Sequence, residues 1–137
     1  MKQIFFLLIT AFIFASCSSK PELTNEFLEG DWTCFDVEIS GEGISEQQQQ
    51  ILKQVSVNSV YSFKDSTINL SSQYSSFEFT YELFSNEDTA TITFIPQGRA
   101  SLKKTVYGVV EYTEDVFIIR ETNPYYSSTT YLQRKRN

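Results

Sequence analysis

The sequence predicts an all-β domain: about eight antiparallel strands in an up-and-down barrel, with one short helix between the first two strands. Polar and apolar residues alternate with a period of two through most of the chain beyond residue 30, which is the period of a half-buried strand. Short turn-like segments join the alternating stretches, so successive strands are expected to pair antiparallel. Closure into a barrel is expected because it leaves no exposed strand edge. A two-sheet sandwich is the competing arrangement.

The first strand is expected over residues 31–40 and ends where Gly41 and Gly43 interrupt the pattern. Alternation divides its residues between two faces, one of which should point into the barrel. The expected inward face carries Thr33, Phe35, Val37 and Ile39, and the opposite face carries Cys34, Asp36 and Glu38.

A helix is expected to start at Ser45, because Ser45-Glu46-Gln47-Gln48 has the S-x-x-Q form of a capping box. An apolar stripe at helical spacing follows, formed by Ile44, Ile51, Leu52 and Val55. Because such a stripe is rarely left in water, we expect the helix over residues 45–55 to lie across one end of the barrel.

Seven further strands are expected over residues 57–64, 67–72, 77–84, 89–95, 102–112, 116–121 and 128–136. The segment 77–84 shows the clearest alternation of the set. Its apolar face carries Phe77, Phe79, Tyr81 and Leu83, and its polar face carries Glu78, Thr80 and Glu82.

The first residues have the features of a bacterial signal peptide. Lys2 provides a basic start, and residues 4–14 form an apolar stretch too short to cross a bilayer as a helix, which takes about 20 residues. Small residues then precede Cys17. The stretch Phe14-Ala15-Ser16-Cys17 resembles the lipobox of bacterial lipoproteins, with Phe14 in place of the usual Leu. An ordinary cleaved signal with an incidental cysteine is the alternative.

The lipoprotein resemblance implies removal of residues 1–16 and acylation of Cys17, for example with palmitate. Two or more acyl chains hold a protein firmly on a bilayer. The implied partner is therefore a membrane, reached through the N-terminal lipid. The implied location is the cell envelope, in the outer membrane, facing the periplasm or the exterior. Residues 17–26 are then a lipidated N-terminus and flexible tether, and residues 27–137 are the barrel domain.

The chain also resembles the lipocalin-like domain of small Gram-negative lipoproteins. The resemblance is carried by Leu28-Glu29-Gly30-Asp31-Trp32, which matches a G-x-W motif, and by 60–65 and 130–134 on later strands. It covers about residues 27–136, and the early helix departs from classical lipocalins. The resemblance implies that Trp32 closes the bottom of the barrel and that Arg134 lies over its ring.

Composition argues against several kinds of site. There is no histidine, which removes the usual catalytic base and the commonest zinc ligand. With Cys17 acylated, Cys34 has no disulfide partner and is expected to be a buried, inert thiol. The net charge of −6 argues against nucleic acid as a partner. We therefore expect a non-enzymatic domain without catalytic residues, metal or cofactor.

The strands carry more large aromatic residues than a core of Val, Ile and Leu needs. An eight-stranded barrel either fills its interior with side chains or holds one small ligand, and the sequence leaves both arrangements open. The expected ligand-binding residues are Tyr61, Phe63, Phe77, Phe79, Tyr81 and Phe94. The leading hypothesis is a membrane-anchored barrel that binds a small apolar or amphipathic ligand in its open end. The alternative is a protein-interaction module with a filled core, such as an envelope-assembly component or an inhibitor of a secreted enzyme.

Overall fold

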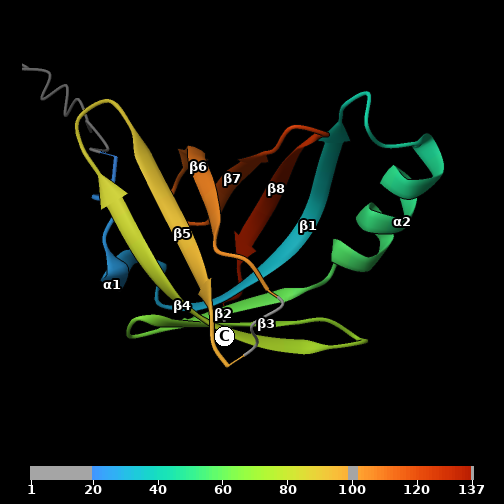
Figure 1. Cartoon of the computed structure of the whole chain (residues 1–137). Coiled ribbons are helices and arrows are strands. Elements are labelled where there is room, and N and C mark those ends of the chain that lie inside the picture. Colours follow the sequence, from blue (N-terminus) through green and yellow to red (C-terminus); the bar gives the residue numbers. More distant parts are fainter. Residues whose placement is uncertain (1–19, 99–101, 137) are drawn as a thin grey trace, which may run out of the picture.

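The protein is a closed barrel of eight antiparallel strands in sequence order, as the sequence predicts (Figure 1). The computed structural model describes residues 20–98 and 102–136. Because β1 pairs with both β2 and β8, the sheet closes on itself, and the sandwich alternative is excluded. The strands are β1 (Gly30–Ser40), β2 (Val60–Lys64), β3 (Thr67–Ser71), β4 (Ser76–Ser85), β5 (Ala90–Pro96), β6 (Thr105–Tyr112), β7 (Val116–Thr122) and β8 (Ser127–Arg134). Two helices accompany them, α1 (Asn25–Leu28) and α2 (Glu46–Ser56).

A β-bulge in β1 changes which of its side chains face inward. The register between β1 and β8 shifts between Cys34 and Asp36, so Phe35 is an extra residue without a partner of its own. The inner face therefore changes parity. Trp32 and Cys34 are fully buried before the bulge, and Val37 is buried after it. The predicted inward position of Phe35 is wrong, because this side chain is 48% exposed, and the predicted outward position of Cys34 is wrong as well.

The two ends of the barrel differ in how they are filled. At the end where β1 begins and β8 finishes, the closed end, α1 covers the opening. At the other end, the open end, β1 finishes at Ser40 and β8 begins at Ser127. Fully buried side chains at the closed end are Leu28, Trp32, Phe117 and Leu132. Because these four side chains are fully buried, the core at the closed end excludes water.

The segment before β1 belongs to the folded domain from Lys20 onward. Leu23 is 5% exposed and is part of the core, and the Thr24 hydroxyl caps α1 by accepting from the N–H of Phe27 at 3.1 Å. The ammonium of Lys20 lies 4.1 Å from the ring centroid of Tyr112. The expected flexible tether over 17–26 is thus too long, because its second half packs on the closed end. Cys17 and the expected signal peptide lie outside the described residues.

Helix α2 begins with the capping box that the sequence predicts. The Ser45 hydroxyl accepts from the N–H of Gln48 at 3.2 Å, and the Gln48 side chain accepts from the N–H of Ser45 at 2.9 Å. The helix lies at the open end beside β1 (Figure 1). None of the helices among the described residues is long and apolar enough to cross a bilayer.

The expectation that the apolar stripe of α2 is covered is wrong for Ile51 and Val55, whereas Ile44 and Leu52 are half-buried. Ile51 and Val55 are 51% and 39% exposed, and no residue of α2 is fully buried. The helix instead faces β1 with a mainly polar side, since the ammonium of Lys53 lies 2.8 Å from Asp36 Oδ1. Ile51 and Val55 therefore lie on the solvent side of α2.

Candidate functional site

A cluster of aromatic rings crosses the interior of the barrel. Phe63 contacts Tyr81 with ring centroids 5.2 Å apart and Phe94 at 6.4 Å. Phe94 also contacts Phe79 at 6.1 Å and Tyr107 at 4.9 Å. These five rings come from β2, β4, β5 and β6, so they link opposite walls. Phe63, Tyr81 and Phe94 are buried and form the floor beneath the open end, and the half-buried Phe79 and Tyr107 pack against this floor.

Three of the six predicted ligand-binding residues serve in this packed floor. Phe63, Tyr81 and Phe94 are each at most 4% exposed. The Tyr81 hydroxyl donates to the backbone carbonyl of Asp65 at 3.0 Å, so its polar group is already used within the protein. These three residues support the site from below and leave little surface for a ligand.

The other three predicted residues, Tyr61, Phe77 and Phe79, are half-buried. Cross-strand register places Tyr61 opposite Leu70, and Leu70 opposite Phe77. Directly paired residues share one face of a sheet. The apolar lining therefore extends from the aromatic floor toward the open end through Tyr61, Phe77 and Phe79.

Two tyrosine hydroxyls stand out within this lining. Tyr61 on β2 and Tyr107 on β6 lie on opposite sides of the eight-stranded ring. Burial raises the pKa of Tyr61 far above its usual range, and the nearby Tyr107 phenol adds to the effect. Burial likewise raises the pKa of Tyr107, followed by the charge of Glu121. Both phenols are therefore partly shielded from water on the inner side of the barrel.

Neither of these hydroxyls is used by the described part of the protein. Every buried side-chain oxygen or nitrogen among the described residues has a hydrogen-bond partner. Tyr61 and Tyr107 are only half-buried, and their hydroxyls remain available to water or to a ligand. Tyr107 was not among the expected ligand-binding residues, although its place in the alternating segment 102–112 is the signal that could have identified it.

Glu121 is a second residue that the sequence analysis missed. On β7, Glu121 pairs with Tyr107 of β6 on one side and with Ser128 of β8 on the other. Ser128 in turn pairs with Ile39 of β1. Tyr107 and Ile39 pack against the core, so Glu121 shares their inner face. Alternation with the buried residues Phe117 and Ile119 on β7 is the sequence signal that places this carboxylate inside.

Trp32 and Arg134 form the closed end together. The Trp32 Nε1–H donates to the carbonyl of Leu28 at 2.8 Å, and Arg134 Cζ lies 4.1 Å from the Trp32 ring centroid. This is the contact that the lipocalin-like resemblance implies. The guanidinium also donates to three backbone carbonyls, those of Phe27 at 2.6 Å, Glu29 at 3.1 Å and Glu114 at 2.7 Å. Arg134 therefore ties α1 and the β6–β7 turn to the end of β8.

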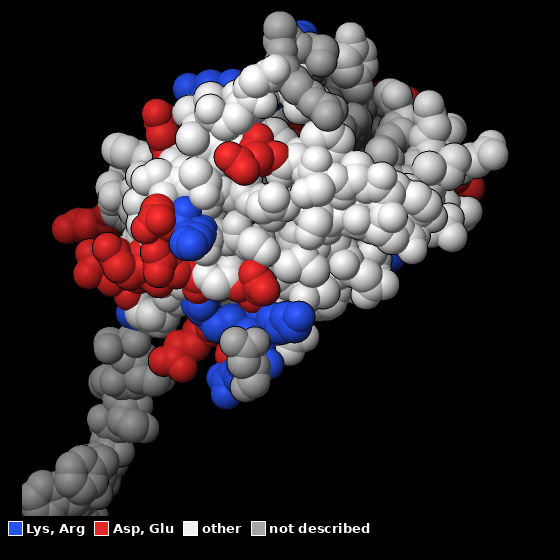
Figure 2. Space-filling view, turned by 90° about the horizontal axis from the view of Figure 1, so that it is seen from below, with Lys and Arg blue, Asp and Glu red and all other residues white. Residues whose placement is uncertain are grey.

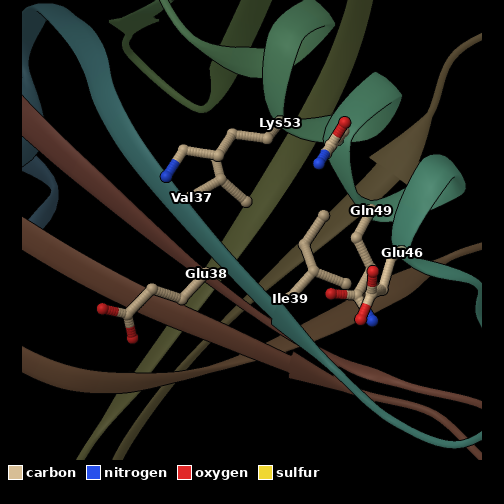
Figure 3. Close-up of a pocket in the computed structure, with 7 residues that line it drawn as sticks. Val37, Glu38, Ile39, Glu46, Gln49 and Lys53 are labelled. Carbon is tan, nitrogen blue, oxygen red and sulfur yellow. The ribbon is translucent and has the colours of Figure 1, made fainter.

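A cleft of about 420 Å³ separates α2 from β1 (Figure 3). Val37 and Ile39 lie on its β1 side, and Gln49 and Lys53 lie on its helix side. β1 pairs with β2 only over Gly30–Thr33, so the later part of this strand has α2 as its neighbour on that side. The complete lining is Val37, Glu38, Ile39, Glu46, Gln49, Gln50 and Lys53. The sequence analysis did not anticipate this cleft, because it assigned the apolar side of α2 to the barrel.

Comparisons with protein-family models, with curated proteins and with solved structures gave no match. Function is therefore inferred from the geometry of this barrel.

Cys34 lacks the features of a reactive thiol. Burial raises the pKa of its thiol to about 11, and a hydrogen bond from the Asp36 backbone offsets only part of that rise. The thiol itself donates to the Asp36 carbonyl at 3.5 Å. Little thiolate forms at neutral pH in such a setting. No cluster of three or more potential metal ligands occurs within residues 20–98 and 102–136.

Surface charge is unevenly distributed. On the face shown in Figure 2, acidic side chains gather toward one end, and a small group of Lys and Arg side chains lies beside them. Most of the remaining surface in that view is uncharged. This face therefore offers no extended basic surface of the kind that follows a phosphate backbone.

Proposed function

We propose that this protein is a lipid-anchored, non-enzymatic barrel of the lipocalin-like type that binds a small apolar or amphipathic ligand in its open end. Cleavage before Cys17 and acylation of that residue would attach it to the outer membrane of the cell envelope. The lipobox-like sequence supports the anchor. The half-buried aromatic residues near the open end support the proposal of ligand binding.

The observation that carries the ligand proposal is the pair of hydroxyls of Tyr61 and Tyr107. Burial raises the pKa of both phenols, and neither hydroxyl forms a hydrogen bond within the described residues. A half-buried hydroxyl that reaches water can exchange that water for a hydrogen bond to a ligand. The aromatic floor beneath them offers apolar contact for the rest of the ligand.

The anchor would also set which end of the barrel faces the membrane. Cys17 is three residues before Lys20, and three extended residues span about 10 Å. Lys20 packs against Tyr112 at the closed end. The closed end would therefore stay near the bilayer, and the open end would face away from it.

Titration of the full-length acylated protein with a fluorescent amphipathic probe, such as a dansyl-labelled decylamine, tests this function. We expect saturable binding, and about a 5- to 15-fold weaker affinity for Tyr61→Phe or Tyr107→Phe, because each removes one hydrogen bond. Tyr74→Phe is the matched control, since Tyr74 is 73% exposed in the β3–β4 turn, and it should not change the affinity. Absence of saturable binding to the unmodified protein would contradict the proposal.

Binding of another protein at α2 is a second candidate. The exposed Ile51 and Val55 and the cleft against β1 favour it. If α2 binds another protein, substitution of Ile51 should weaken that binding and substitution of Tyr61 should not. If the barrel binds a small ligand, substitution of Tyr61 should weaken binding and substitution of Ile51 should not.

A further inference from the structure

Glu121 places a carboxylate on the inner face of the barrel near the open end. Glu121 is half-buried and lies in a row of paired residues with Tyr107 and Ser128. The Tyr107 ring is held against Phe94, with centroids 4.9 Å apart, which fixes the inner side of this row. Glu121 therefore lies next to Tyr107 on the inner face of the barrel, toward the open end.

No cation of the described protein neutralises this carboxylate. Neither of the two salt bridges among the described residues includes it. The preceding Arg120 belongs to the outer face, where its Nε donates to the Thr129 hydroxyl at 3.0 Å. Lys103 and Lys104, which precede β6, are exposed and form no ion pair with it.

The groups around Glu121 suit a cation better than an anion. Aromatic faces attract ammonium groups through their ring quadrupoles, and a phenol oxygen can accept a hydrogen bond from them. Tyr107 and Phe94 supply such faces, and Tyr126 lies close enough for its phenol to influence the pKa of Tyr107. A carboxylate or phosphate head would instead be repelled by the negative charge of Glu121.

We infer that the open end selects an amphipathic ligand with an ammonium head, which pairs with Glu121 while its alkyl part lies on the aromatic floor. This inference rests on the proposed ligand-binding function and specifies the chemical class of the ligand. It covers primary amines and quaternary ammonium groups, since both carry the charge that the site requires.

Three probes with the same alkyl chain separate the head group from the tail: decyltrimethylammonium, decanol and decanoate. Each is titrated calorimetrically into the full-length acylated protein below its micelle concentration. We expect decyltrimethylammonium to bind about tenfold more tightly than decanol, and decanoate to bind more weakly than decanol. Glu121→Gln, which keeps the size of the side chain, should remove the advantage of the cation and leave decanol unchanged.

Glu82→Gln is the matched control, because Glu82 is exposed on the outer face of β4, and it should preserve the preference for the cation. Far-UV circular dichroism verifies that each variant is folded. Equal or tighter binding of decanoate, or an undiminished cation preference in Glu121→Gln, would overturn this inference while ligand binding itself stands. Failure of all three probes to bind would overturn both.

Discussion

Replacing Trp32 by alanine is expected to lower the free energy of unfolding by about 3–5 kcal/mol, as large aromatic truncations in cores do. The side chain is fully buried, and its ring contacts Phe27 and Phe117 with centroids 5.9 Å apart in both cases. The change also leaves the Leu28 carbonyl without the indole donor. Urea denaturation followed by far-UV circular dichroism measures the effect.

Phe84→Ala provides the control for the loss of an aromatic ring. Phe84 is 61% exposed on β4, and its removal should change stability by no more than about 0.5 kcal/mol. A denaturation midpoint for Trp32→Ala equal to that of the unmodified protein would show that Trp32 does not close the barrel.

Replacing Arg134 by glutamine is expected to cost about 2–4 kcal/mol of stability. The change removes three charge-assisted hydrogen bonds to backbone carbonyls and the stacking of the guanidinium on Trp32. Arg134→Lys should recover only part of the loss, because an ammonium cannot reproduce the planar fork of donors. The same urea denaturation measures both variants.

Arg136→Gln tests whether the effect belongs to Arg134 or to positive charge near the C-terminus. Arg136 forms an exposed ion pair with Asp115 at 2.6 Å, and such pairs contribute at most about 1 kcal/mol. Similar losses for the two arginines would contradict the structural role given to Arg134.

The strand order and the α2 capping box were predictable because they depend on local patterns. Alternation over 77–84 predicts the inner face of β4 that the structure has, with Tyr81 buried and Glu78 exposed. The bulge in β1 was not predictable in this way. It depends on the register between β1 and β8, which is set by residues about 100 positions away in the chain.

The site was predictable only in part for a related reason. Periodicity identifies aromatic residues on an inner face, but it does not tell which rings pack together at the floor and which remain half-buried. Phe63 and Tyr61 share the inner face of β2, yet Phe63 is in the floor and Tyr61 lies in the lining. The contact between α2 and β1, which includes the ion pair between Lys53 and Asp36, is also not revealed by a local pattern.

Native mass spectrometry of the protein purified from its own membranes tests the central proposal most directly. We expect a chain that begins at Cys17 and carries covalent acyl groups, together with a noncovalent complex that loses one small amphipathic molecule on collisional activation. A chain that retains residues 1–16 without acyl groups, and that carries no small molecule under the gentlest conditions, would contradict the proposal of a lipid-anchored ligand-binding barrel.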